Sequence, residues 1–396
     1  MHRRWHADRP LLRAVVAIAA GTALGVSRAA WAGDGAPAVG PVAPAPAHLP
    51  VVPLAASPGP PARRWDWGLL PIVTYAPETS LGLGGVIVAF DDAPAPAAGP
   101  RRDDEVALFL GATLRKQFVV NGEMLKYWRD ARYRLTEEAT AVRFPNYFWG
   151  VGNDTPEHAQ DLYTQGMFGS RTAFSVRAME EVYVGAVLAA GSYRTGSVTP
   201  GGAVAAYVTG HPDGGALASL GAMILRDTRD DAMGPRSGSL STLTVLLSDR
   251  RVASGFTYQQ YELDQRNYLP LGRRTVLALE AYGRAVPGDV PLDELPALGG
   301  AARLRGYYQG RFRDHVYLVG QFEARIHLFS RFSVAPFGGV GNVFPTLRAI
   351  STTHTKVAGG VGLRFSLKKE RDLNLRLDLA KSAISSGVYV NIGEAF

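Results

Sequence analysis

The sequence has no cysteine among its 396 residues, which excludes a disulfide framework and a thiolate metal site. From residue 66 onward it has no apolar run of the roughly 20 residues that a membrane-spanning helix needs. It also lacks the G-x-S-x-G, H-E-x-x-H and phosphate-loop patterns of common enzymes. It is instead rich in glycine and aromatic residues, with 45 Gly, 16 Tyr and 16 Phe, a composition suited to strands and tight turns.

Histidine is scarce too, and its distribution argues against catalysis. Of the eight histidines, only His315 and His327 lie outside the N-terminal segment, the proline-rich stretch after it and the expected outer loops. Neither has a nucleophile at a recognisable spacing. Asp227, Asp230 and Asp231 suggest calcium as an alternative, but a turn motif described below explains them better. We expect no enzyme, no metal site and no cofactor.

The N-terminus has the pattern of a secretory signal peptide. Arginines precede an apolar stretch at 14–26, and a small-x-small cleavage pattern follows at 30–32. The apolar stretch is too short to span about 30 Å of hydrocarbon as a helix. The sequence therefore predicts a signal peptide at 1–32 and an extended Pro/Ala-rich periplasmic linker at 33–65. Removing 1–32 takes away five arginines and one aspartate, so the formal charge falls from +7 to +3 and indicates no nucleic-acid partner.

Apolar and polar residues alternate from residue 66 to residue 396 with the period of β-strands. A soluble sandwich also alternates, but many of these segments exceed the usual five or six residues of globular strands. Short and long connections follow one another, as in outer-membrane barrels. The sequence predicts an all-β fold, a transmembrane antiparallel β-barrel of about sixteen strands. The expected strands are 66–77, 80–91, 103–115, 117–129, 131–144, 161–178, 181–195, 215–227, 239–249, 257–268, 273–285, 314–329, 331–343, 356–368, 372–381 and 387–396.

The last expected strand also indicates export to the outer membrane. Val388, Val390, Ile392 and the terminal Phe396 share one parity, which we expect to face lipid. A terminal aromatic residue resembles the signal that the barrel-assembly machinery reads, so Phe396 is the candidate assembly signal. Glu394 has the same parity, and we expect it near the interface, where a charge costs about 0–1 kcal/mol.

One long loop carries a motif. With the first strand rising from the periplasm, the loop at 286–313 is extracellular, and it contains Leu304-Arg305-Gly306-Tyr307 and, further on, Gly310. A floppy surface loop is the simplest interpretation. The tetrapeptide, however, resembles the V-R-G-F/Y motif of the BamA/TamA superfamily of outer-membrane barrels, also called bacterial surface antigens. That resemblance implies a loop that folds back into the barrel lumen.

Further stretches resemble the same family, in the same order. Asp227-Thr228-Arg229-Asp230 with Pro235-Arg236-Ser237-Gly238 is similar to its D-x-R-D…P-x-x-G turn, expected here to be periplasmic. The stretch 336–344 is similar to its P-F-x-D-x-G-N-V-F strand. The stretches 360–364 and 376–380 resemble its closing hairpin. These matches cover roughly the last 170 residues.

Two departures from the family pattern bear on the prediction. Family members that insert or secrete proteins carry periplasmic POTRA domains before the barrel, whereas only the linker stands there in this sequence, so it resembles a POTRA-less branch. Gly339 replaces the aspartate that usually pairs with the loop arginine. An arginine inside a lumen needs an acceptor, and the residues of inward parity that offer one are Glu323, Asp378 and Glu280. Glu323 is the expected partner because it lies on the strand that leaves the loop.

Three functional classes remain open from the sequence. The resemblance favours a barrel of the cell outer membrane that assists insertion or translocation of protein. The alternatives are a passive or gated pore and, more distantly, an outer-membrane enzyme. The expected partners are outer-membrane lipid and lipopolysaccharide, the barrel-assembly machinery during biogenesis, and a protein substrate.

Overall fold

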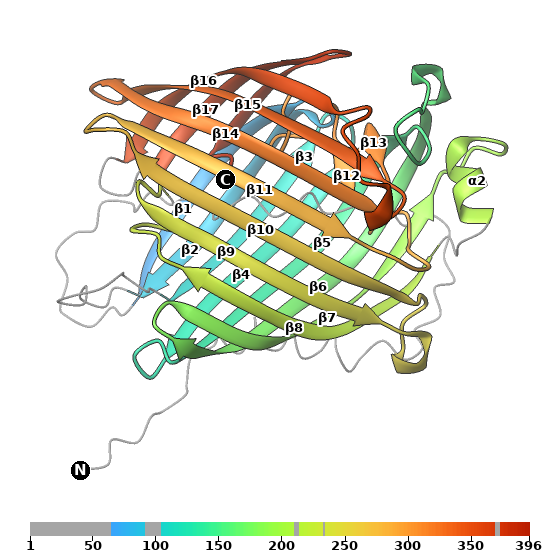
Figure 1. The fold of residues 1–396 in the computed structure, drawn as a ribbon, viewed down its shortest axis with the longest axis horizontal. Helices are drawn as coiled ribbons and strands as arrows, with labels where there is room; N and C mark the ends of the chain where they lie inside the picture. The colour runs from blue at the N-terminus through green and yellow to red at the C-terminus, as the bar shows by residue number, and fades with distance from the viewer. Residues whose placement is uncertain (1–64, 92–103, 210–213, 233, 369–372) are drawn as a thin grey trace, which may run out of the picture. The chain divides into compact units, whose positions relative to one another are not determined.

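Sixteen strands close into one antiparallel barrel (Figure 1). The computed structural model describes residues 65–91, 104–209, 214–232, 234–368 and 373–396. The predicted signal peptide and nearly all of the predicted linker lie outside the described residues. Within these ranges no helix is long and apolar enough to cross a membrane.

The barrel strands confirm the fold class and the strand number expected from the sequence. Strand β5 continues to Phe148, past the expected end at 144, so the outer loop after it is shorter than predicted. The bounds are β1 (Trp65–Ala76), β2 (Ser80–Asp91), β3 (Glu105–Thr113), β4 (Phe118–Trp128), β5 (Tyr133–Phe148), β6 (Asp161–Met179), β7 (Val182–Gly196), β8 (Gly214–Asp227), β9 (Gly238–Ser248), β10 (Tyr258–Pro270), β11 (Thr275–Ala285), β14 (Val316–Phe329), β15 (Phe332–Phe344), β16 (Lys356–Lys368), β17 (Leu373–Ser382) and β18 (Ser386–Ile392).

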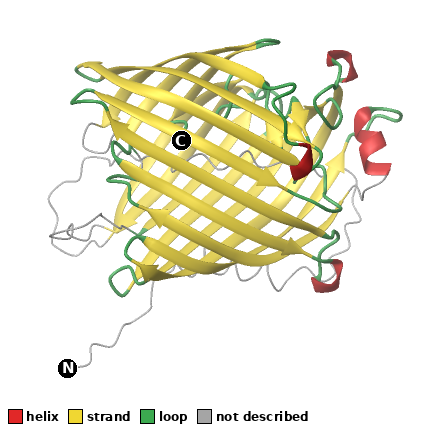
Figure 2. Ribbon diagram, viewed as in Figure 1, coloured by secondary structure: helices red, strands yellow, loops and turns green. Residues whose placement is uncertain are grey.

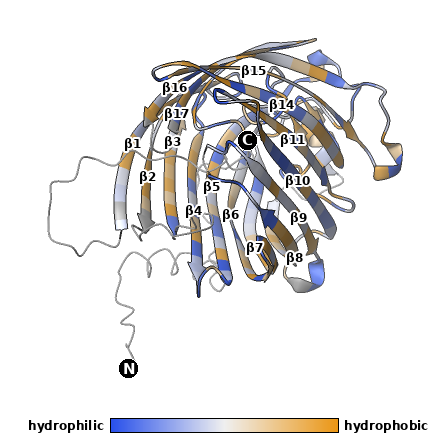
Figure 3. Ribbon diagram, turned by 60° about the vertical axis from the view of Figure 1, so that its left-hand side comes forward, coloured by the Kyte–Doolittle hydropathy of each residue, from blue (hydrophilic) through white to orange (hydrophobic). Residues whose placement is uncertain are grey.

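The two faces of the barrel wall follow the alternation in the sequence. On β17, Leu375, Leu377 and Leu379 are exposed, whereas Arg376 and Asp378 between them are buried. The hydropathy colours alternate in the same way along the strands (Figure 3). Because successive strand residues point to opposite faces, an apolar outer surface and a polar interior arise together.

The two ends of the barrel differ. The helical segments, α2 (Ala203–Thr209) and the 3-10 turns η1 (Glu157–Ala159), η2 (Arg250–Val252) and η3 (Leu347–Ala349), all lie at the end with the long loops (Figure 2). The described turns at the other end are mostly short, such as 180–181 and 330–331. The long outer loops expected from the sequence are present, but the alternation is incomplete, because the connections 77–79, 114–117 and 383–385 at the same end are short.

The loop between β11 and β14 enters the lumen. Its two short strands, β12 (Ala297–Leu298) and β13 (Phe312–Arg313), pair with each other and not with the wall. The aromatic and aliphatic side chains of the loop form a buried cluster with wall residues. Its members are Tyr282, Leu298, Leu304, Tyr307, Phe312, Tyr317, Val319, Val343 and Ala358. This apolar packing gives the loop a fixed position inside the barrel.

The barrel closes through a short contact. Strands β17 and β18 pair continuously from Leu375 opposite Ile392 to Lys381 opposite Ser386. Strands β1 and β18 share a single register pair among the described residues, Tyr75 opposite Val390. We call this contact the seam.

The C-terminal tail, residues 393–396, leaves the wall instead of continuing β18. Gly393 has φ +84° and bends the chain, and Phe396 lies in a buried cluster with Tyr268, Val276 and Ala278. The expectation that Phe396 and Glu394 share the lipid-facing parity of β18 is therefore wrong. Parity holds only while the strand stays extended, and here it stops at Ile392.

Candidate functional site

The tip of the inward loop has a backbone shape that requires glycine. Gly306 has φ +111°, in the region that disfavours side chains. A Cβ on Gly306 would also lie 2.9 Å from the backbone carbon of Lys381. Its N–H donates to the Tyr389 hydroxyl at 2.9 Å, and its carbonyl accepts from the Ser382 hydroxyl at 3.1 Å. The loop tip is thus fitted against the extracellular end of β17 and β18.

Arg305 projects from this tip into the barrel wall and is almost completely buried. One amino group donates to the Asp378 carboxylate at 2.5 Å, and the other donates to Glu323 at 2.8 Å. The guanidinium carbon lies 3.5 Å from the centre of the Phe337 ring, a cation–π contact. The structure therefore brings together the loop arginine and two of its three candidate acceptors.

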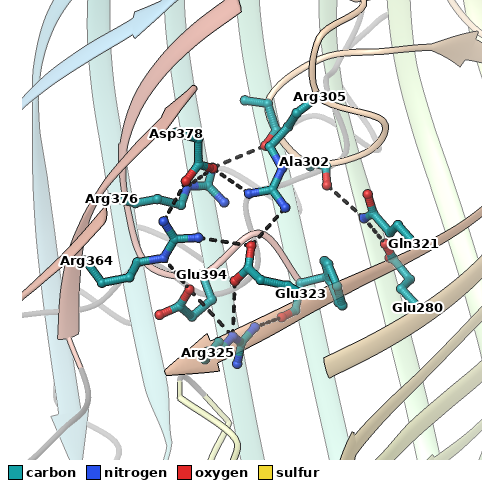
Figure 4. Close-up of polar contacts among 12 residues, drawn as sticks. Glu280, Ala302, Arg305, Gln321, Glu323, Arg325, Arg364, Arg376, Asp378 and Glu394 are labelled. Atoms are coloured by element: carbon teal, nitrogen blue, oxygen red, sulfur yellow. Dashed lines mark hydrogen bonds and ion pairs between the residues drawn. The ribbon is translucent and has the colours of Figure 1, made fainter. Parts of the chain in front are cut away.

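A second arginine shares both acceptors. Arg364 donates to Asp378 at 2.5 Å and to Glu323 at 2.9 Å, and its Nε donates to Glu394 at 2.9 Å (Figure 4). Arg325 donates to Glu323 at 3.2 Å. These contacts link the loop tip to β14, β16, β17 and the C-terminal tail.

The charged side chains of this network pair with one another. We call the network the lumen cluster, which consists of Arg305, Glu323, Arg325, Arg364, Arg376, Asp378 and Glu394. Its four arginines face three carboxylates, and Arg325 also donates to the terminal Phe396 oxygen at 2.6 Å. Such pairing is physically necessary because an unpaired charge away from bulk water is costly.

Glu280, the third candidate acceptor, does not bind Arg305. It accepts from Arg303 Nε at 3.0 Å, and Arg303 stacks on the Tyr282 ring with its guanidinium carbon 3.5 Å from the ring centre. Asp264 accepts from the same arginine at 3.1 Å. Arg303 and Arg305 leave the loop in different directions and meet different carboxylates.

Gln321 lies beside Gly339, the position of the missing family aspartate. The two residues are opposite each other in the β14–β15 register. The Gln321 side chain accepts from the Leu304 N–H at 3.2 Å and donates to the Ala302 carbonyl at 3.0 Å. It therefore holds the loop backbone directly, a role that no charge pattern in the sequence pointed to.

The remaining motif residues support the loop from within. Leu304 has φ +50° and is buried, and Tyr307 donates to the Val357 carbonyl at 3.3 Å. Gly310 has φ +80°, and a Cβ there would lie 2.7 Å from Arg313 Nε.

The Asp227–Gly238 motif forms a turn at the opposite end of the barrel. Arg229 donates to Asp227 at 2.9 and 2.8 Å, and Asp230 accepts from the backbone N–H of Arg236 at 2.9 Å. Gly238 has φ +92°. The Pro235 carbonyl accepts from Arg325 at 3.5 Å, so this turn touches the lumen cluster.

The sequence interpretation missed part of the lumen cluster. The missed arginines are Arg325, Arg364 and Arg376. Their inward parity on their strands could have predicted that they face the lumen. Glu394 had no such signal because its place depends on the bend at Gly393. No group of His, Cys, Asp or Glu in the described ranges has an arrangement that could hold a metal ion.

Comparisons with known proteins identify the fold and the family. Residues 123–396 match the model of the Omp85 superfamily domain. BamA from Haemophilus ducreyi lacking POTRA domains 1–3 is similar in structure, with a TM-score of 0.58 and 14% identity over 84% of this chain and 70% of that one. CdiB from Acinetobacter baumannii has a TM-score of 0.54 and 10% identity over 84% of this chain and 60% of that one. CdiB from Escherichia coli has a TM-score of 0.52 and 10% identity, over 87% of this chain and 67% of its own length.

These likenesses agree with the sixteen-stranded closed barrel and with the motif order in the sequence. No curated protein sequence matches the chain. The family match covers well over half of the 396 residues. This chain belongs to the Omp85 superfamily and is an outer-membrane β-barrel of the BamA/TamA type.

Proposed function

We propose that this barrel assists the insertion of proteins into the outer membrane or their translocation across it. The observation that carries the proposal is the seam. Every other pair of adjacent barrel strands has an extended register, whereas β1 and β18 share only Tyr75 opposite Val390 among the described residues. The family membership and the resemblance to BamA and CdiB structures support the same role.

The seam offers a strand edge to another chain. Backbone N–H and C=O groups at a sheet edge bind an incoming extended segment by strand addition. The bend at Gly393 directs the C-terminal tail into the lumen, so β18 does not follow β1 toward its start at Trp65. The seam is the place where the wall can part with the fewest lost backbone hydrogen bonds.

The lumen argues against a passive pore as the main role. The inward loop packs in a buried apolar cluster, and Arg305 at its tip is fixed to two strands of the wall. An open channel would require this loop to break the ion pairs that Arg305 makes with Glu323 and Asp378. The proposed role is non-catalytic, and it needs no cofactor.

A disulfide across the seam tests the proposal. Because the chain has no cysteine, Tyr75→Cys with Val390→Cys introduces one defined pair at directly opposed positions. Purified protein in vesicles would be supplied with an unfolded outer-membrane barrel as substrate, and insertion would be followed by protease protection. We expect the oxidised seam variant to lose insertion and a reductant to restore it.

The matched control is Val73→Cys with Leu83→Cys, an outward-facing pair between β1 and β2. It should insert substrate normally when oxidised. Equal insertion by the locked and unlocked seam would contradict the proposal. Steady conductance of the wild-type protein in planar bilayers, together with no insertion, would favour the pore instead.

A further inference from the structure

A basic cavity lies at the periplasmic mouth of the barrel. It has a volume of about 330 Å³, and the described residues that line it include six arginines but only one carboxylate, that of Glu394. We call it the periplasmic cup. Its basic lining residues are Arg236, Arg273, Arg274, Arg325, His327, Arg331 and Arg364.

Strand pairing brings these residues together from separate turns. The His327 N–H donates to the Arg274 carbonyl at 2.8 Å, which places β14 beside the β10–β11 turn. Arg236 donates to the Arg273 carbonyl at 3.3 Å, which attaches the β8–β9 turn. Arg331 donates to the Leu367 carbonyl at 2.9 Å across the β15–β16 edge.

The arginines of the cup fall into two groups. Arg325 and Arg364 form its inner wall and are paired within the lumen cluster. The rim arginines, 236, 273, 274 and 331, have no carboxylate within ion-pair distance in the part of the chain that the structure describes. Positive charge therefore accumulates on the rim.

Two described carboxylates near the cup are already engaged. Glu394 accepts from Arg364 and from the Asn374 amide, at 2.9 and 2.8 Å. Asp230 accepts from backbone N–H groups of its own turn, including that of Ser237 at 3.1 Å. These acceptors cannot turn toward the rim arginines without losing their present partners.

Other described turns at this end carry carboxylates of their own. The β4–β5 turn has Asp130 between Arg129 and Arg132, and the β6–β7 turn contains Glu180 and Glu181. The excess of arginine is therefore larger at the cup than at these two turns.

We propose that the periplasmic cup binds a phosphate group. Guanidinium groups bind phosphate through paired hydrogen bonds, and one phosphate has enough oxygens and charge for several arginines. A single carboxylate offers two oxygens and one charge, which leaves most of the rim uncompensated. The cavity has room for a phosphate and part of its carrier. The carrier is either a phospholipid of the periplasmic leaflet or a soluble phosphate compound, and the site stands independently of protein insertion.

The test uses the full-length barrel purified in a neutral detergent. Inorganic pyrophosphate is titrated by calorimetry, and phosphatidylglycerol and phosphatidylcholine are compared by native mass spectrometry. Binding of pyrophosphate without retention of phosphatidylglycerol assigns a soluble ligand. Selective retention of phosphatidylglycerol assigns the lipid. Either ligand should bind more weakly at higher salt.

Arg273→Gln with Arg274→Gln should weaken the binding by about tenfold or more, as expected for losing charge-assisted hydrogen bonds. The matched control, Arg129→Gln with Arg132→Gln on the β4–β5 turn, should leave it unchanged. If the first pair prevents assembly, Arg331→Gln provides the same comparison. Binding of neither ligand, or equal weakening by both pairs, overturns the proposal.

Discussion

The Arg305 guanidinium lies 2.5 Å from the Asp378 carboxylate and so joins the tip of an extracellular loop to β17, the strand before the seam strand. Both side chains are inaccessible to solvent. The same carboxylate binds Arg364 on β16, so the loop and the closing hairpin share one acceptor. A change at the loop tip therefore acts on the strands beside the seam.

Arg305→Ala should loosen the inward loop and destabilise the barrel. Deleting one partner of a buried ion pair typically costs about 3–5 kcal/mol because the other charge remains buried. Urea unfolding in detergent, read by tryptophan fluorescence, would measure the loss. Combining Arg305→Ala with Glu323→Ala or with Asp378→Ala should cost less than the sum of the single changes.

Arg348→Ala is the control for Arg305→Ala. Arg348 lies in the exposed turn η3 and makes no ion pair with the described residues, so its loss should have little effect. If the losses of stability in both double variants equal the sums of the single losses, the loop is not held by these ion pairs.

Much of the fold could be predicted from the sequence because each strand must alternate between lipid and lumen. From that constraint, the sequence pattern predicted the strand number and the inward parity of Glu323 and Asp378. It could not distinguish Arg303 from Arg305 as the partner of Glu280, since that depends on how deep the loop enters. The inward position of Phe396 could not be predicted from the sequence either, because the positive φ at Gly393 ends the alternation of inward and outward side chains.

Gly306→Ala should destabilise the docked loop by more than the backbone strain of placing alanine at a positive φ. Its Cβ would press on the Lys381 backbone at 2.9 Å, and neither segment can move freely. Gly201→Ala is a matched control, since Gly201 has φ +79° with nothing within 4 Å of its Cβ. Unfolding in urea should show a clearly larger loss for Gly306. Similar losses would mean that the close approach to Lys381 is unimportant.

Gly339→Asp restores the aspartate that the family pattern has but should destabilise this barrel. Its Cβ would lie 2.8 Å from the Gln321 Cβ and 3.0 Å from the Gly320 carbonyl. Gln321→Ser leaves these Cβ and backbone contacts in place but removes the rest of the glutamine side chain. It should recover part of the loss, because the aspartate carboxylate then has room to take over polar contacts with the loop. Urea unfolding of both single variants and the double variant measures this. If the double variant loses as much stability as the two single variants together, Gln321 has not replaced the aspartate.

Phe396→Ala should release the C-terminal tail. Truncating a buried phenylalanine costs about 3–5 kcal/mol, and here the tail can leave instead of the barrel unfolding. With Ala395→Cys as the single thiol of the protein, a maleimide should react faster in the Phe396→Ala background. Ala383→Cys, exposed in the β17–β18 turn, gives the rate for full access. Unchanged slow labelling at residue 395 would show that Phe396 does not hold the tail, whereas its role as an assembly signal remains a separate prediction.

Asp293 should make docking of the inward loop depend on pH. Burial raises its pKa from 3.8 to about 7, although Gln165 and Arg313 oppose the shift. The Gln165 amide donates to Asp293 Oδ1, while Asp293 Oδ2 and Gln165 Oε1 have no hydrogen-bond partner among the described residues. A protonated carboxyl can therefore donate back to the same amide.

Because the folded protein holds this proton more tightly than the unfolded chain, stability should fall as pH rises from about 4 to about 7 and then level off. Asp293→Asn keeps the amide contact without a charge, so it should flatten this slope and be more stable than the wild type at pH 8. Glu78, whose pKa burial also raises to about 7, contributes in the same window, and Glu78→Gln is the comparison that separates the two. Urea midpoints at pH 5, 6 and 8 would measure the effect. An Asp293→Asn variant with the full wild-type slope would show that this carboxyl is ionised in the docked loop.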